Sequence, residues 1–288
     1  MSTDMSTWFI TGASRGFGSR MVAAALDAGD QVVATARRTE GIADAHPNAG
    51  DRLLVHTLDV SDEVQAVAAV DAAVARFGGI DVVVNNAGYG IFGAVEEVSD
   101  REVRAVFDAN VFGLLNVTRA VLPTLRAQRC GRIINIGSSA GISVGAGRGI
   151  YGATKFAVEA ITEALRAELA PLGVRVSVVE PGSFRTDFLA HHQQRRPGES
   201  TDVYGETVGA LQEAIDGLDG KQPGDPAKAV AAIRALAAAD DPPLRLPLGS
   251  DSVALMAQKA AALAETADAE RIRAAATDFA APLKRALF

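Results

Sequence analysis

Short apolar runs alternate with amphipathic stretches along most of the chain. Such runs are typical of buried strands, and the stretches between them carry apolar residues at helical spacing. Strands are predicted at residues 7–11, 31–36, 53–58, 81–84, 131–136 and 174–179, with a last one at 242–248. Strands that alternate with helices form right-handed crossovers in a parallel sheet. The pattern therefore predicts an α/β fold, a doubly wound parallel sheet of about seven strands with helices on both faces.

Capping residues mark where several of the intervening helices begin. Asp62, Ser99 and Asp225 each precede a stretch with helical periodicity, as helix N-caps do. Helices are predicted at residues 19–28, 62–77, 151–172, 203–217 and 225–238, and a long one starts at residue 99. We see no linker or repeat and expect one domain, 1–288, with an insertion at about 183–225 that covers a binding site and a helical extension at about 250–288.

A glycine-rich turn follows the first predicted strand. Residues 11–18 read TGASRGFG, with glycines at 12, 16 and 18. Between a strand and a helix, such a turn brings backbone N–H groups close to a pyrophosphate at the helix N-terminus. A purely structural turn is the alternative, and the strand-turn-helix setting favours a dinucleotide site.

Two arginines, Arg37 and Arg38, follow the second predicted strand. In dinucleotide-binding folds this position contacts the adenosine ribose, where an acidic residue binds the 2′-hydroxyl of NAD and arginine accommodates the 2′-phosphate of NADP. Ala36 supplies no carboxylate, and Arg37 with Arg15 of the glycine turn would hold a phosphate. Arginines at a strand end are also often merely solvated. We predict NADP(H) as the cofactor.

Tyr151 and Lys155 lie four residues apart in a predicted helix and so share one face. A phenol has an ordinary pKa of about 10, and a neighbouring ammonium lowers it. With the hydroxyl of Ser138 bound to a substrate oxygen, the three side chains can pass a proton to or from a carbonyl or alcohol. The same spacing arises by chance on helix surfaces. Its position after a predicted strand, where parallel sheets bind ligands, favours an active site.

Several further polar residues follow predicted strands or lie among apolar ones. Residues 85–88, Asn-Asn-Ala-Gly, allow close backbone approach and supply hydrogen bonds. Asp59 is a candidate for binding the adenine amino group, or else a turn-forming residue. Asn110 lies in a predicted helix among residues expected to be buried, where its amide must be satisfied. Its amide is either bonded structurally or holds a water in a proton relay.

Composition and charge narrow the class of protein. The chain has 288 residues, is 48% hydrophobic and carries a net charge of −7, which argues against nucleic-acid or anionic-membrane partners and suits a cytoplasmic protein. No apolar run reaches the length that a bilayer requires. A single cysteine, Cys130, excludes an internal disulfide and a multi-cysteine zinc site. His191 and His192 lack a third ligand, so we predict no metal.

Taken together, the motifs resemble those of the short-chain dehydrogenase/reductase family over nearly the whole chain up to about residue 250. Residues 11–18 look like its cofactor glycine motif, and residues 85–88 look like its structural motif. Pro181-Gly182 followed by Thr186 is similar to its nicotinamide-side motif. The positions of the family's catalytic tetrad match Asn110, Ser138, Tyr151 and Lys155. One departure is Gly137, where many relatives carry serine.

The resemblance implies a Rossmann-type fold and hydride transfer between a nicotinamide and a carbonyl or alcohol carbon. Tyr151 would be the general acid or base, Lys155 would lower its pKa and hold the nicotinamide ribose, and Ser138 would orient the substrate. Asn110 would support a water-linked relay. The implied cofactor-binding residues are Gly12, Ser14, Arg15, Gly16, Phe17, Gly18, Arg37, Asp59, Val60, Asn86, Ala87, Gly88, Tyr151, Lys155, Pro181, Gly182 and Thr186.

We therefore expect an NADP(H)-dependent reductase of a small ketone or aldehyde, or the corresponding alcohol dehydrogenase. The alternative is a non-catalytic NADP-binding regulator on the same fold. The predicted substrate pocket is mostly apolar and consists of Phe92, Ser138, Val144, Phe184, Phe188 and Tyr204. The C-terminal extension either covers the site or forms a contact in a homo-oligomer, which we expect for this chain.

Overall fold

A seven-stranded parallel sheet forms the centre of the computed structural model, which describes residues 5–189, 196–198 and 201–279. Its order is β3-β2-β1-β4-β5-β6-β7, the doubly wound order of a Rossmann-type sheet. The strands are β1 (Thr7–Thr11), β2 (Gln31–Ala36), β3 (Leu53–Thr57), β4 (Val82–Asn85), β5 (Gly131–Ile136), β6 (Val174–Pro181) and β7 (Arg245–Leu248). The predicted fold class is confirmed.

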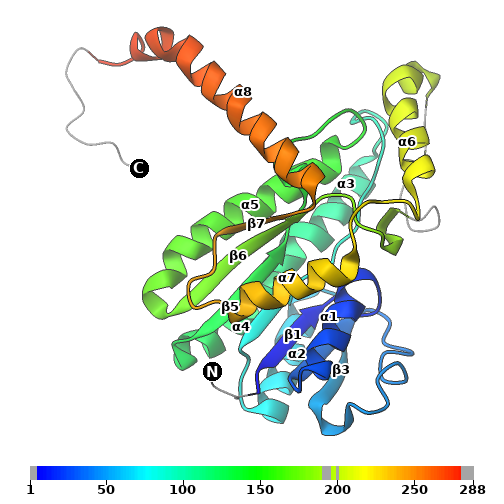
Figure 1. Cartoon of the computed structure of the whole chain (residues 1–288), viewed down its shortest axis with the longest axis vertical. Coiled ribbons are helices and arrows are strands. Elements are labelled where there is room, and N and C mark those ends of the chain that lie inside the picture. Colours follow the sequence, from blue (N-terminus) through cyan, green and yellow to red (C-terminus); the bar gives the residue numbers. More distant parts are fainter. Residues whose placement is uncertain (1–4, 190–195, 199–200, 280–288) are drawn as a thin grey trace.

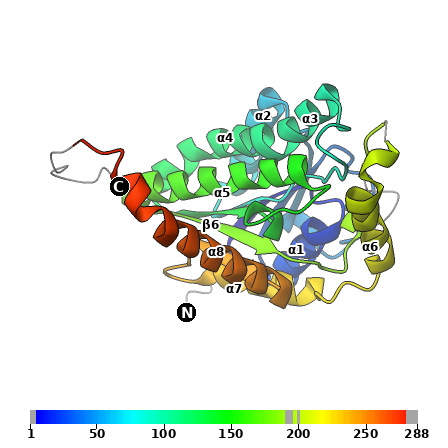
Figure 2. The same ribbon diagram turned by 90° about the horizontal axis from the view of Figure 1, so that it is seen from above.

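Helices cover both faces of this sheet (Figure 2), with α2, α4 and α5 on one face and α1 and α7 on the other. The helices are α1 (Gly16–Asp27), α2 (Glu63–Phe77), α3 (Asp100–Phe107), α4 (Gly113–Gln128), α5 (Gly149–Leu169), α6 (Ala210–Leu218), α7 (Pro226–Ala238) and α8 (Ser250–Ala275). Because both faces are covered, β1 and β4 are buried at every residue. This explains why the strands read as unbroken apolar runs.

The predicted capping residues begin their helices as expected. Asp62 accepts hydrogen bonds from the backbone of Val64 and Gln65 at the start of α2, and Ser99 forms a capping box with Glu102 at the start of α3. The side chain of Asp225 caps α7. The differences lie at element ends: α1 starts at residue 16 rather than 19, and β7 at residue 245 rather than 242.

One long helix was predicted from residue 99, but its hydrogen bonding changes midway. Between α3 and α4, the segment Asp108–Phe112 forms a wider π-helical turn, and this turn contains Asn110. By length and composition the 29-residue helix Asp100–Gln128 could cross a membrane, contrary to the sequence-based expectation. Its most apolar window is 50% buried, and α4 contacts α2, β4 and β5. These contacts are those of a core helix.

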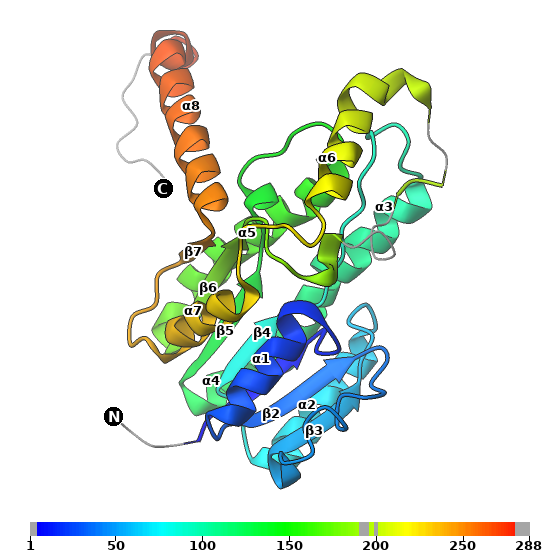
Figure 3. The same cartoon turned by 45° about the vertical axis from the view of Figure 1, so that its right-hand side comes forward.

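Two helical parts extend beyond the body (Figures 1 and 3): α6 at one side and α8, which projects away from the sheet. The helix predicted at residues 203–217 is divided into a 3-10 turn (Asp202–Tyr204), a π-helical turn (Gly205–Gly209) and α6. Nearly all described side chains of α8 are exposed, whereas Ser252 at its base is buried. His191, His192 and residues 280–288 of the predicted extension lie outside the described residues.

Candidate active site

The glycine turn after β1 is built for close packing. Gly12 and Gly16 have positive φ angles of 65° and 57°, which glycine adopts without steric cost. A Cβ at Gly18 would collide with the carbonyl oxygen of Gly12. The Nδ2 group of Asn86 donates to the carbonyls of Thr11 (2.8 Å) and Gly12 (3.1 Å). Asn86, predicted to bind the cofactor, therefore also braces the turn.

Gly18→Ala is expected to destabilise the fold by about 1–3 kcal/mol, as overpacking does, and to weaken binding of a nicotinamide cofactor because the turn must open. Fluorescence titration with NADPH and urea denaturation measure the two effects. The matched control is Gly29→Ala, because Gly29 also has a positive φ but open space around its Cβ position. It should cost stability and leave cofactor affinity intact. Equal NADPH affinities of the two variants would contradict the assignment.

The N-terminus of α1 fits a pyrophosphate. No side chain caps this helix and no acidic residue lies in its first turn, so its first N–H groups are available to an anion. Ser14 and Arg15 of the turn are exposed beside it. The ring of Phe17 packs edge-on against Phe184, with centroids 5.5 Å apart. The chain thus provides the backbone cradle that the sequence predicts for a dinucleotide.

The end of β2 carries positive charge and no carboxylate. Arg37 is exposed, Ala36 is buried, and within the described part of the chain neither Arg15 nor Arg37 has an ion-pair partner. Asp59 accepts hydrogen bonds from the backbone N–H (3.1 Å) and the hydroxyl (2.7 Å) of Ser61. Asp59 therefore forms the turn, and its contact with adenine stays a prediction, as does that of Val60.

Tyr151 and Ser138 meet beyond the carboxyl ends of the strands. Tyr151 is buried, and burial raises the pKa of its phenol to about 12, while a hydrogen bond with Ser138 and the charge of Arg148 lower it. The Oγ of Ser138 also accepts a hydrogen bond from the backbone of Ala140 at 3.1 Å. A phenol with this pKa is protonated at neutral pH, so Tyr151 holds a proton to donate.

Lys155 lies one helical turn beyond Tyr151 and is buried. Its Nζ donates to the carbonyl oxygen of Ile136 at 2.7 Å and lies 5.9 Å from the centroid of the Tyr151 ring. Burial lowers the pKa of Lys155 to about 8, against the opposing effect of Glu159. Arg148 is a cation that lowers the pKa of Tyr151 here, and the expected effect of Lys155 on that pKa stays a prediction.

Asn110 is fully bonded within the π-helical turn. Its Oδ1 accepts from the backbone N–H of Tyr89 (3.0 Å), and its Nδ2 donates to the Tyr89 carbonyl (2.9 Å) and to the Thr154 hydroxyl (3.0 Å). The structural interpretation of Asn110 is confirmed, and a water relay stays a prediction. A Cβ at Gly88 would lie 2.9 Å from Asn110 Oδ1 and 3.9 Å from Lys155 Nζ. Asn110, Gly88 and Lys155 are therefore neighbours, as the tetrad requires.

An aromatic and aliphatic wall surrounds Tyr151. The rings of Phe92 and Phe188 lie with their centroids 6.0 Å and 5.8 Å from that of Tyr151. Leu211 and Ile215 of α6 pack into the same cluster, although no local sequence signal singled them out. Val144 is half-exposed and packs over the turn of α5 that carries Tyr151. This contact is close, since a Cβ at Gly152 would collide with the Val144 side chain. Phe92, Val144 and Phe188 therefore lie around the helical turn of Tyr151, and their role in a substrate pocket stays a prediction.

Two residues predicted to line the pocket have other roles. Phe184 packs against Phe17 and belongs to the core beneath α1 and α7, because its backbone pairs with Gly224 in an isolated bridge. The hydroxyl of Tyr204 hydrogen-bonds the carboxylate of Glu96 near the surface. The prediction was wrong for these two positions, since a loop sequence does not show which side of the chain faces the site.

The segment that follows β6 is held by the base of α8. The N–H of Gly182 donates to the Leu248 carbonyl at 2.8 Å, and the N–H of Ser183 donates to Asp251 Oδ2 at 2.7 Å. The Ser252 hydroxyl donates to the carbonyl of Glu180 at 2.7 Å. The Thr186 hydroxyl lies further along and accepts from the backbone of Phe188 at 3.4 Å. The base of the C-terminal extension therefore holds the backbone on both sides of the Pro181-Gly182 motif.

A partly buried cluster of charged side chains begins one helical turn beyond Lys155. Nη1 of Arg245 donates to both Glu159 and Glu180, the latter at 2.6 Å, and Nη2 donates to Glu163. Burial and the charge of Glu180 raise the pKa of Glu159 to about 7, while Arg245 opposes the shift. Sequence reasoning missed this cluster. Its available signals were the position of Glu159 four residues after Lys155 and that of Glu180 directly before Pro181.

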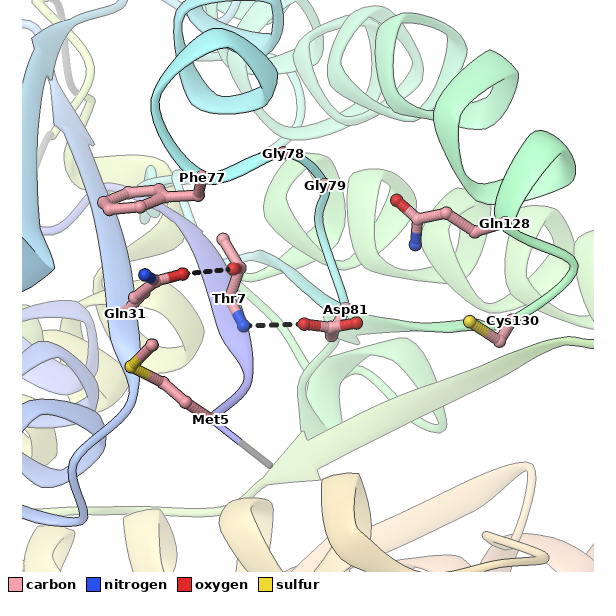
Figure 4. A pocket seen from close by; sticks show the side chains of 9 residues that line it. All are labelled: Met5, Thr7, Gln31, Phe77, Gly78, Gly79, Asp81, Gln128 and Cys130. Atoms are coloured by element: carbon pink, nitrogen blue, oxygen red, sulfur yellow. Dashed lines mark hydrogen bonds between the residues drawn. The ribbon is translucent and has the colours of Figure 1, made fainter. Parts of the chain in front are cut away.

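A depression lies at the opposite edge of the sheet (Figure 4). It has a volume of about 530 Å³ and lies at the amino ends of the strands, lined by Met5, Thr7, Gln31, Phe77, Gly78, Gly79, Asp81, Gln128 and Cys130. Parallel sheets bind their ligands beyond the carboxyl ends of the strands. The catalytic candidates lie at that opposite edge, so this depression is not the active site.

Known proteins are similar to this chain in sequence and in fold. The family model for short chain dehydrogenases matches residues 6–197. Oxidoreductase BOA17 of Botryotinia fuckeliana is 37% identical over 247 residues, which cover 85% of this chain and 89% of that protein. A short-chain dehydrogenase from Streptomyces avermitilis has a structure with a TM-score of 0.89 and 40% identity, covering 96% of this chain and 100% of that one.

Structures with bound cofactors are also similar to this chain. A short chain dehydrogenase/reductase from Burkholderia phymatum in complex with NAD has a TM-score of 0.78 and 25% identity, over 89% of this chain and 93% of that one. ElxO with NADP bound has a TM-score of 0.73 and 25% identity, over 87% of this chain and 100% of that one. Both nicotinamide cofactors therefore occur among structures of this kind.

Proposed function

This chain belongs to the short-chain dehydrogenase family, and from that premise we propose that it is an NADP(H)-dependent oxidoreductase that interconverts a ketone or aldehyde with its alcohol. The observation that carries the proposal is the position of Ser138 beside Tyr151, where its hydroxyl lowers the pKa of the phenol, with Lys155 one helical turn away. This group lies at the same edge of the sheet as a glycine turn that fits a dinucleotide.

A nicotinamide cofactor supplies or accepts the hydride when it is bound, and the protein supplies position and protons. The turn at residues 12–18 and the first N–H groups of α1 would hold its phosphates, and Asn86 to Gly88 and Pro181-Gly182 would flank it. In reduction, Tyr151 Oη donates its proton to the carbonyl oxygen while the Ser138 hydroxyl hydrogen-bonds the same oxygen. The cations of Arg148 and Lys155 stabilise the phenolate that Tyr151 becomes. In oxidation, the same phenolate accepts the proton.

The preference for NADP(H) rests on charge. Arg15 and Arg37 are exposed and lack acidic partners among the described residues, and the end of β2 has no carboxylate that would repel a 2′-phosphate. Arginine presents a planar fork of donors that matches phosphate. The two arginines therefore form the clamp that we assign to the 2′-phosphate.

Arg37→Asp is expected to raise the Michaelis constant for NADPH by about 10–100-fold, since a charged hydrogen bond is lost and a repulsive charge is added. The constant for NADH should change much less. Steady-state kinetics with both cofactors measures the ratio, and Arg126→Asp, at an exposed arginine near the end of α4, controls for the change in net charge. An unchanged ratio in Arg37→Asp would refute the clamp.

The direct test of the function is NADPH oxidation against a panel of ketones and aldehydes, followed by absorbance. Turnover of at least one compound is expected, with NADPH used in preference to NADH. Tight NADPH binding without turnover of any compound, in either direction, would instead support the alternative of a non-catalytic NADP-binding regulator.

A further inference from the structure

Arg148 lies directly before α5 and belongs to the same helical turn as Tyr151. Its carbonyl oxygen accepts the helical hydrogen bond from the N–H of Gly152 at 2.7 Å. Residues three apart in a helix share a face, so Arg148 and Tyr151 are neighbours on it, and Lys155 follows four residues later. Two cations therefore flank the phenol along one line of the helix.

The Arg148 guanidinium has no counter-charge within the described part of the chain. Its side chain is partly buried, and its Nε is buried without a hydrogen-bond partner. A guanidinium stays charged at all physiological pH values, and a buried charge without a partner is costly. By contrast, Arg245 contacts three carboxylates and Arg234 contacts Asp30. A partly buried cation without a counter-charge is stabilised by an anion from outside the chain.

The surroundings of Arg148 indicate where that anion lies. Arg148 lowers the pKa of Tyr151, and Tyr151 in turn affects that of Arg148, so the guanidinium acts on the phenol that donates the proton. The apolar side chains packed around Tyr151 are those of Phe92, Ala140, Leu211 and Ile215. A ligand that fits both features has an anionic group close to the reacting carbonyl and an apolar remainder.

We propose that Arg148 binds a carboxylate of the substrate, so that the preferred substrates are oxo acids with an apolar body. This inference rests on the proposed function, because it concerns the same site. The fork of N–H donors in arginine matches the two oxygens of a carboxylate. Bound in this way, the carboxylate holds the neighbouring carbonyl against Tyr151 and Ser138. The apolar body of the substrate lies against Phe92 and the side chains of α6.

The first experiment measures binding without turnover. Phenylglyoxylate, 3-benzoylpropionate and the methyl ester of each are titrated into the full-length protein saturated with NADP⁺. Isothermal titration calorimetry measures the affinity for each compound. We expect the acids to bind more tightly than the esters. Arg148→Gln should weaken the binding of the acids by about 10–100-fold, which corresponds to the loss of a charged hydrogen bond. Arg148→Lys should retain part of the affinity, and Arg126→Gln should behave as wild type.

The second experiment measures turnover of the same four compounds with NADPH. The ratio of kcat/KM for acid over ester should fall at least about tenfold in Arg148→Gln, whereas a general loss of activity would lower both alike. Equal losses for acids and esters, or acids that bind no better than esters to the wild type, would overturn the role of Arg148. If the acids bind through Arg148 but neither acids nor esters react, the anion site holds and the proposed reductase activity fails.

Discussion

Replacing Tyr151 with phenylalanine is expected to lower kcat by about 10²–10⁴-fold on any carbonyl compound that the wild type reduces, because the proton donor is lost. The ring, and its packing against Phe92 and Phe188, remains, so the affinity for NADPH and the thermal stability should hardly change. Single-turnover kinetics and NADPH fluorescence titration separate the two effects.

The chain offers a matched control for this substitution. It has three tyrosines, and Tyr204→Phe removes a hydroxyl that hydrogen-bonds Glu96 away from the catalytic group. This variant should keep a kcat close to that of the wild type. A Tyr151→Phe enzyme with undiminished kcat would sink the mechanism. An equal loss of kcat in Tyr151→Phe and Tyr204→Phe would attribute the effect to the segment around Tyr204 instead.

Replacing Arg245 with methionine is expected to destabilise the protein by about 3 kcal/mol at pH 8, because two buried carboxylates lose their counter-charge. Glu180 is fully buried and Glu159 nearly so. Urea denaturation of the wild type and the variant measures the difference in the free energy of unfolding. Adding Glu180→Gln to Arg245→Met should recover part of this loss, since one of the two charges is then gone.

The effect of Arg245→Met should depend on pH with a defined sign. The pKa of Glu159 is about 7 in the folded protein, above its ordinary value of 4.5, chiefly because of burial. A carboxyl whose pKa is raised by folding favours the folded state below its unfolded pKa, and this contribution is lost as the pH rises toward the folded value. Without Arg245 the pKa values of the two carboxyl groups rise further, so these groups are more fully protonated and uncharged at pH 5 than at pH 8. The variant should therefore lose less stability at pH 5 than at pH 8. An equal loss at both pH values would show that packing, not charge, dominates.

Local sequence signals predicted the sheet and the positions of the catalytic candidates. Strands such as residues 31–36 are buried on both faces, and their mostly apolar sequences reflect this directly. Ser138, Tyr151 and Lys155 meet because they follow one strand and begin the next helix, so their proximity is encoded within a short stretch. The turn at residues 12–18 is encoded in the same way, since its glycines satisfy backbone geometry that no other residue adopts as readily.

The remaining features depend on contacts between distant parts of the chain. Arg245 meets Glu159 and Glu180, which lie 86 and 65 residues before it, and no local pattern joins them. Phe184 enters the core because its backbone pairs with Gly224, and an apolar residue in a loop fits a pocket or a core equally well. Arg148 was also overlooked, since an arginine before a helix is ordinary until its lack of a partner is visible.

The attachment of α8 sets where this protein can be divided. Asp251 and Ser252 hold the segment that starts at Glu180, and they lie in the first turn of a helix that extends to Ala275. We therefore expect a shortened chain to keep these contacts only if it ends inside α8, after these two residues, and not at the last strand. Beyond them the helix is mostly exposed, so its outer turns are the natural place to join another domain, a tether or a solid support.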